Sequence, residues 1–131
     1  MIVVDTNVIA NLVLNGSLKG QAVRLLKNEP LWGVPLLWKS EFRNVLALYI
    51  RKGLLSLNEA IRLMDYVENE MKLVEYSINS LKVLELISKS KLSSYDCEFV
   101  SLAHQLNTKL VTDDKLILKE FPKIATPLRQ I

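Results

Sequence analysis

The chain opens with Ile2-Val3-Val4-Asp5-Thr6-Asn7, and this stretch carries the pattern that most constrains the fold. Its three β-branched residues form a short apolar run, which is typical of a strand buried in a parallel sheet. An acid ends the run, and apolar residues from Val8 onward recur at helical spacing. We therefore expect a buried strand that ends at Asp5 and leads directly into a helix closing at Asn15-Gly16.

The rest of the chain repeats this alternation between short apolar runs and helical periodicity. Later strands are expected at Leu31 to Val34, Leu73-Val74, Lys109 to Thr112 and Ile124 to Thr126. Later helices are expected around Ala22 to Leu26, from Pro35 to Lys52, after a capping box at Ser56 to Glu59, from Ile78 to Ser88, from Ser93 or Ser94 to Asn107, and after Asp114. Strands separated by helices predict a three-layer α/β fold with a mainly parallel central sheet.

Composition and length limit the class of protein. The 131 residues are half hydrophobic, with four glycines and four prolines, so we expect one globular domain over residues 1–131 and exclude disordered or collagen-like chains. The longest apolar run, Val45 to Ile50, is too short to cross a membrane, and the acid at position 5 does not fit a signal peptide. The single cysteine, Cys97, permits no internal disulfide and favours the cytoplasm.

Acidic residues follow the strands in a way that indicates a site. Asp5 ends the first strand, and Asp113 and Asp114 end the late strand. Because ligands bind outside the carboxyl ends of strands in open parallel sheets, these acids are candidates to meet. Asp96 opens the helix before the late strand, and Glu41 borders the apolar stripe of the long helix, where an unpaired acid is unfavourable.

The residues alone leave structural explanations open. Asp5 and Asp96 could cap helices, Asp113-Asp114 could form a turn, and Glu41 could pair with a neighbouring base. Thr6 and Asn7 could either orient Asp5 or cap the first helix. We expect no ligand role for His104, because it has no histidine or cysteine companion, and structural roles for Cys97, Trp32 and Trp38.

Four short motifs occur in order: Val-Val-Asp5-Thr6-Asn7, Ser40-Glu41, Ser94-Tyr95-Asp96-Cys97 and Leu110-Val111-Thr112-Asp113-Asp114. Together, and over essentially the whole chain, they resemble the PIN-domain ribonucleases, most closely the VapC-type toxins of toxin–antitoxin pairs. The resemblance implies a metal-dependent endoribonuclease that leaves a 5′-phosphate and a 3′-hydroxyl, inhibited by an antitoxin protein. It also implies a homodimer, which the mean hydropathy of +0.18 and the apolar helices between Leu54 and Met71 favour.

The resemblance also assigns roles to individual residues. It makes Asp5, Glu41, Asp96 and Asp114 the catalytic and metal-binding acids. Three further residues support these acids: Thr112 with its hydroxyl, and Thr6 and Asn7, which directly follow Asp5. Asp113 falls on the variable position of the late motif. Cys97 stands where small residues such as alanine are common in the family.

The chemistry of the acids independently favours a metal site. Carboxylates that converge in one cleft repel each other and raise each other's pKa values, and divalent cations cancel the charge. Oxygen-only ligation suits the hard ions Mg²⁺ or Mn²⁺ better than Zn²⁺. An antitoxin segment in or beside this cleft is expected to bring a basic side chain to the carboxylates.

The net charge of +3 is compatible with RNA as a partner. On the long helix with Glu41 lie Lys39, Arg43, Arg51 and Lys52. At 100° per residue, Lys52 is about 20° from Glu41 around the helix and Arg43 about 200°. We expect Lys52, and with it Lys39, to contact RNA, although an ordinary solvated face is the competing explanation.

Three other classes compete with the nuclease hypothesis. A phosphotransfer receiver domain would place its acidic pair after the first strand, whereas the pair here ends the late strand. A haloacid-dehalogenase-like phosphatase would need a second aspartate at position 7, where this chain has Asn7. A PIN-fold RNA-processing scaffold without activity remains the principal alternative.

Overall fold

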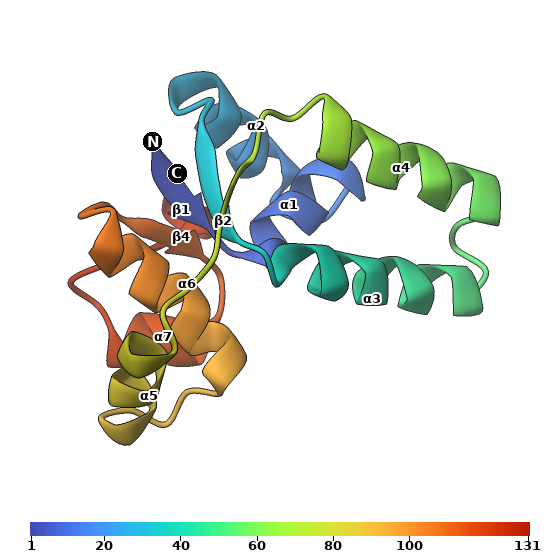
Figure 1. Cartoon of the computed structure of the whole chain (residues 1–131). Helices are drawn as coiled ribbons and strands as arrows, with labels where there is room; N and C mark the ends of the chain where they lie inside the picture. The colour runs from blue at the N-terminus through green and yellow to red at the C-terminus, as the bar shows by residue number, and fades with distance from the viewer.

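The computed structural model describes residues 1–131 and contains one five-stranded sheet with helices on both faces (Figure 1). The strands are β1 (Ile2–Val4), β2 (Trp32–Pro35), β3 (Val74–Tyr76), β4 (Leu110–Thr112) and β5 (Ala125–Pro127). They lie in the order β3-β2-β1-β4-β5, and every neighbouring pair is parallel. The predicted α/β fold with a parallel central sheet is therefore confirmed.

Seven α-helices connect these strands. They are α1 (Thr6–Val13), α2 (Lys19–Asn28), α3 (Trp38–Arg51), α4 (Leu57–Asn69), α5 (Ser80–Ser88), α6 (Ser94–Gln105) and α7 (Lys115–Glu120), followed by the short 3₁₀ helix η1 (Leu128–Gln130). None of them is long and apolar enough to span a membrane.

The central strand β1 divides the core in two. Ile2 and Val4 point to one face, where they pack with residues of α1 to α4, while Val3 points to the other face, with residues of α5 to α7. This alternation follows from the two-residue period of a strand. Because both faces are covered, all three β1 residues are buried, as the unbroken apolar run predicts.

Several predicted boundaries differ from the structure. Pro35 does not open the long helix; it ends β2 opposite Tyr76, and α3 begins three residues later. Proline has no backbone N–H to donate, but β1 pairs with β2 only as far as Gly33. Pro35 therefore removes no hydrogen bond between these two strands. Strand β3 begins at Val74 and not at Leu73. The cap of α6 was expected at Ser93 or Ser94, and it is Ser93.

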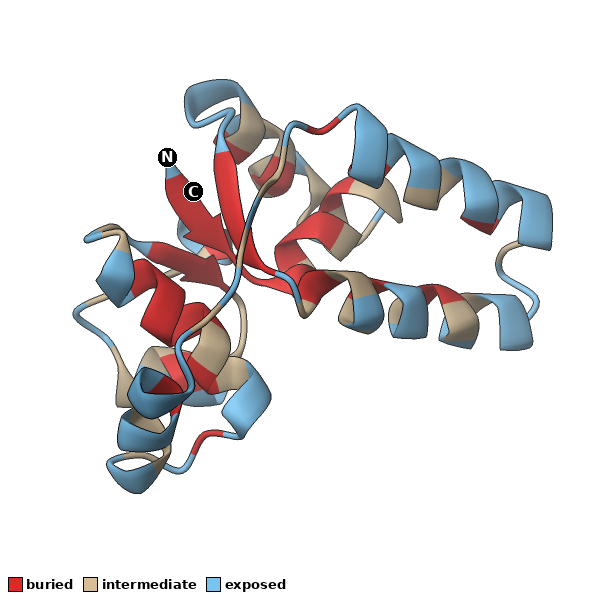
Figure 2. Cartoon of the chain, in the orientation of Figure 1, coloured by how far each residue is buried: buried red, intermediate tan, exposed pale blue.

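The capping box before α4 is confirmed, with Glu59 N donating to Ser56 Oγ at 3.1 Å and Ser56 N to Glu59 Oε1 at 2.9 Å. It begins the second arm of the α3–α4 hairpin, which projects from the sheet (Figure 1). Most of the outer hairpin is exposed in Figure 2. Leu54, Leu57 and Ile61 on it are exposed apolar side chains, so this region has the character expected of an interface.

Candidate active site at the carboxyl edge of the sheet

Strands β1 and β4 bring together residues that are more than a hundred positions apart. They pair in parallel, with Val4 opposite Val111, so both strands end at the same edge. Thr112 Oγ1 donates to Asp5 Oδ2 at 2.7 Å across this edge, and the backbone N of Asp5 donates to the carbonyl of Val111 at 3.0 Å. The parallel pairing thus places the late motif beside the first one.

Asp5 is the most buried acid of the site, with 7% of its surface exposed. It caps α1, its Oδ1 accepting from Thr6 N at 2.7 Å, and its Oδ2 also lies 3.3 Å from Asn7 Nδ2. Burial is the main cause that raises the pKa of Asp5 to about 7; the hydrogen bond from Thr112 opposes it, and the charges of Glu41 and Asp96 add to it. Near pH 7 the carboxyl of Asp5 is therefore about half protonated, and a bound cation would favour its charged form.

Glu41 reaches the same edge from the first turn of α3. Thr6 Oγ1 donates to Glu41 Oε1 at 2.8 Å, which ties α3 to the start of α1. Partial burial is the main cause that raises the pKa of Glu41; the hydrogen bond from Thr6 opposes it, and the charges of Asp96 and Glu98 add to it.

Asp96 and Asp114 approach from the other side of β1. Asp96 lies in the first turn of α6, and burial followed by the charge of Asp114 raises its pKa. Asp114 caps α7, its Oδ1 accepting from Leu116 N and Ile117 N at 3.0 and 2.9 Å, while its own N donates to Thr112 Oγ1. The four predicted acids therefore gather at one edge, and each of them is linked to another by a charge effect.

The remaining predicted site residues are placed differently. Asp113 pairs with Arg129, whose Nη2 lies 3.0 Å from Asp113 Oδ1. Lys39 Nζ lies 3.6 Å from Glu68 Oε2 and 3.8 Å from Glu75 Oε1, so its charge is already engaged.

Lys52 caps the carboxyl end of α3 and is exposed. It lies eleven residues from Glu41, or about 16 Å along the helix axis.

Two residues near this edge were missed by the sequence analysis. Glu98 contributes charge to Glu41 and has a raised pKa caused by its own burial. Arg129 pairs with Asp113 because Thr112 lies opposite Pro127 in the β4–β5 register. The only sequence signal for Glu98 was its position two residues after Asp96 on the same helix. Nothing in the local sequence indicates the pairing of Arg129 with Asp113.

The donors fit a hard divalent cation by their chemistry. All of them are oxygens, and burial raises the pKa values of three of the carboxyls, an effect that a nearby cation would oppose. Asn7 Oδ1 is in addition buried without a hydrogen-bond partner. No three Asp, Glu, His or Cys side chains lie close enough together to hold an ion as the structure stands, so the fit rests on donor chemistry and not on a preformed cage.

Comparisons with known proteins agree with this arrangement. Ribonuclease VapC3 from Pyrobaculum aerophilum is 28% identical over 129 residues, which cover 96% of this chain and 98% of the relative. The crystal structure of PAE2754 from the same organism matches with a TM-score of 0.78 at 22% identity, over 98% of this chain and 84% of that one. A toxin-antitoxin complex from Klebsiella pneumoniae matches with a TM-score of 0.69 at 16% identity, over 98% of each chain. The model of the PIN domain family matches residues 2–124, and the chain therefore belongs to the PIN domain family.

Proposed function

We propose that the protein is a metal-dependent endoribonuclease that acts as the toxin of a toxin–antitoxin pair. The observation that carries this proposal is the buried carboxyl of Asp5, held by Thr6 and Thr112 and surrounded by further acids at the carboxyl edge. Evolution rarely retains a buried, repelled acid for stability, because such a group favours unfolding. The ribonuclease name of the VapC3 relative supports the same activity.

Asp5, Glu41, Asp96 and Asp114 are the residues that would hold Mg²⁺ or Mn²⁺. When bound, the cation supplies electrostatic stabilisation for the charge that grows on a phosphodiester under attack by water. The chain's own hydroxyls orient the carboxylates: Thr112 donates to Asp5, and Thr6 donates to Glu41. No side-chain nucleophile is required, and the expected products carry a 5′-phosphate and a 3′-hydroxyl.

An apolar groove at the ends of α1 and α3 away from the acidic edge supports an antitoxin partner. It has a volume of about 450 Å³ and lies between the end of α1 and the α3–α4 hairpin, with six hydrophobic residues among its nine. Val13, Leu14, Tyr49 and Leu63 are four of them. An amphipathic helix of the antitoxin fits such a groove, and a basic side chain beyond it would reach the acids.

We also propose that the protein forms a homodimer, because Leu57 and Ile61 remain exposed on α4. Light scattering at micromolar concentration should give twice the mass of the chain. A monomer would contradict this part of the proposal.

Cleavage of a mixed RNA pool tests the activity. We expect degradation with millimolar Mg²⁺ or Mn²⁺, none after addition of EDTA, and fragments whose 5′-phosphates permit ligation. RNA that binds tightly but stays intact with every divalent metal would instead favour the non-catalytic scaffold.

A further inference from the structure

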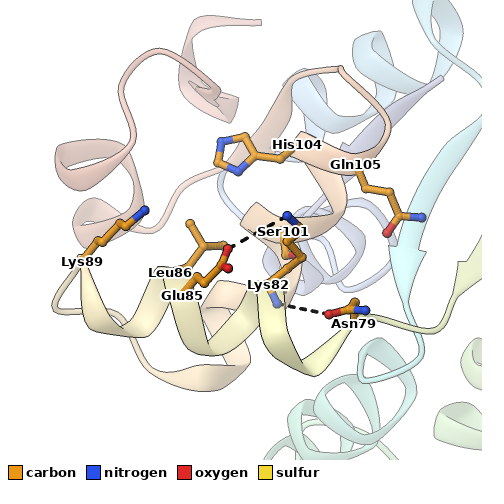
Figure 3. Close-up of a pocket in the computed structure, with 8 residues that line it drawn as sticks. All are labelled: Asn79, Lys82, Glu85, Leu86, Lys89, Ser101, His104 and Gln105. Carbon is orange, nitrogen blue, oxygen red and sulfur yellow. Dashed lines mark hydrogen bonds and ion pairs between the residues drawn. The ribbon is translucent and has the colours of Figure 1, made fainter.

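A polar hollow lies between α5 and α6 (Figure 3), on a part of the surface that the proposed active site does not use. Its volume is about 540 Å³, and only one of its eight lining residues, Leu86, is hydrophobic. Hollows of this size accommodate small organic molecules, but those that bind drugs are mostly apolar. The polar lining points to a charged or strongly hydrogen-bonding ligand.

The charge of this hollow is positive. Lys82 and Lys89 line it, and its only acid is Glu85. Lys82 Nζ lies 4.0 Å from Glu85 Oε2, a long and exposed ion pair that neutralises little, and Lys89 forms no ion pair. The hollow therefore offers cationic groups to an anion.

Ser101 supplies a hydroxyl that lines the hollow. The residue as a whole is only 5% exposed, and its hydroxyl makes no hydrogen bond to another group of the chain. This hydroxyl is therefore free to bond to water or to a ligand in the hollow. The neighbouring amide of Gln105 also has no partner in the chain and lies on the same side of α6 in Figure 3.

A second hollow shares one lining residue, His104, with the first. It has about 530 Å³, contains Lys109 and Lys123 and has no acidic residue. Lys109 Nζ donates to the carbonyl of Lys123 at 2.7 Å, while the side chain of Lys123 has no partner. The His104 ring packs edge-on against Phe121, with ring centres 6.2 Å apart, so it is held at the junction.

We call the four lysines and the histidine of the two hollows the basic track: Lys82, Lys89, His104, Lys109 and Lys123. Its second hollow, with Lys109 and Lys123, lies by the amino ends of β4 and β5, opposite the acidic edge. Helix α6 joins the two regions, with Asp96 in its first turn and His104 in its last. Eight residues separate them, a rise of about 12 Å along the helix.

We propose that the basic track binds the phosphates of single-stranded RNA, with one nucleotide seated between α5 and α6 and hydrogen-bonded to Ser101. The identity of the polyanion as RNA rests on the proposed function. A free nucleotide carries phosphate only at one end and would occupy a single hollow, whereas two neighbouring hollows with two lysines each fit phosphates at separate points along a strand. The track would hold the RNA several nucleotides from the bond that is cleaved.

Salt-dependent binding of a short fluorescent single-stranded RNA, in EDTA so that it stays intact, tests this proposal. The test variant is Lys89→Ala/Lys123→Ala, and the control is Lys27→Ala/Lys72→Ala, which removes two exposed lysines elsewhere. At roughly 0.1 M salt we expect the test variant to bind about tenfold more weakly, with the slope of log K against log salt reduced by about 1.4, or about 0.7 per lost contact. The control should bind within about twofold of the parent protein with the same slope.

Ser101→Ala separates hydrogen bonding from charge. It should weaken binding by about threefold without changing the salt slope, since a neutral hydrogen bond contributes about 1 kcal/mol or less and releases no counterion. Circular dichroism melting should show every variant folded, because all four lysines are exposed and Ser101 lies within a helix, where alanine is well tolerated. Equal losses in the test and control pairs would overturn the proposal.

Two further measurements separate the possible failures. If adenosine monophosphate or inorganic phosphate displaces the RNA as efficiently as unlabelled RNA does, the site binds a single anion. That result would overturn the proposal that it binds an RNA strand. If the parent protein cleaves RNA but the test variant binds RNA as tightly as the parent does, the basic track does not bind RNA and the proposed function stands. If no metal supports cleavage but the lysine pairs differ as expected, the proposed function fails and the track stands.

Discussion

The two edges of the central sheet are built in opposite ways. At the carboxyl edge, Asp5 is buried and held by hydrogen bonds from Thr6 and Thr112, although burial opposes its charge. At the amino edge, Lys109 and Lys123 of the basic track are exposed, and the side chain of Lys123 has no partner. This contrast fits the proposed roles, in which the acids are fixed for chemistry at an energetic cost and the lysines attract an anion from solvent.

The largest effect is expected when the acidic edge loses one charge. Asp5→Asn should reduce metal-dependent cleavage by at least about 1,000-fold, because losing several kcal/mol of metal binding costs tenfold per 1.4 kcal/mol. Asparagine caps helices as well as aspartate, so α1 should remain intact. Single-turnover cleavage checks this, with Asp65→Asn on the exposed face of α4 as the control. Equal activity of the two variants would remove Asp5 from the site.

A second comparison separates the two neighbouring acids of the late motif. Asp114→Asn should lower cleavage by about 100-fold, while Asp113→Asn should lower it less than about fivefold, because its partly exposed pair with Arg129 contributes little. Both variants keep a side-chain oxygen for capping or pairing. The ratio of their single-turnover rates is the measurement, and the reverse order would make Asp113 the functional acid.

The pH dependence of stability should distinguish the two edges without any RNA. The pKa of Asp5 is raised from 3.8 to about 7, so the folded state holds its proton more tightly than the unfolded state. Stability of the metal-free protein should therefore fall as pH rises from about 4 to 7, by up to about 4 kcal/mol from this group. Above that range the loss is complete.

Asp5→Asn removes this dependence. Its melting temperature should exceed that of the parent protein by several degrees at about pH 8 and match it at about pH 4 or below. Millimolar Mg²⁺ should close the gap at the higher pH by stabilising the parent protein alone. A gap of the same size at both pH values would show that the charge of Asp5 is not its cause.

The smallest effect concerns the long helix between the edges. Lys52→Ala should weaken RNA binding by about twofold and reduce the salt slope by about 0.7, as expected for one phosphate contact. Lys39→Ala serves as the control, since Lys39 is engaged by Glu68 and Glu75. An unchanged salt slope for Lys52→Ala would show that Lys52 is an ordinary solvent-exposed residue that does not contact RNA.

The central strands were predictable because their information is local. Ile2 to Val4 and Leu110 to Thr112 are buried on both faces, so their apolar runs appear directly in the sequence. Strand β3 lies at the edge of the sheet, carries the exposed Glu75 and pairs only with β2, so its register was visible only in the fold.

The same distinction explains the site. Asp5, Asp96 and Asp114 each follow or precede an element whose end the sequence marks, and the structure brings them to one edge. The helical period could place Lys39 on a face of α3, but it could not predict that Lys39 pairs with Glu75 of strand β3. The pairing of Arg129 with Asp113 likewise depends on the β4–β5 register.

Each of the four acids lies at the start of a helix: Asp5 caps α1, Glu41 and Asp96 lie in the first turns of α3 and α6, and Asp114 caps α7. The aligned peptide dipoles give each helix start roughly half a positive charge. Four starts at one edge therefore contribute up to roughly two positive charges from the backbone alone. The edge is less negative than its carboxyls suggest, which lets it attract a cation through the side chains and still tolerate the polyanionic backbone of a nucleic acid beside it.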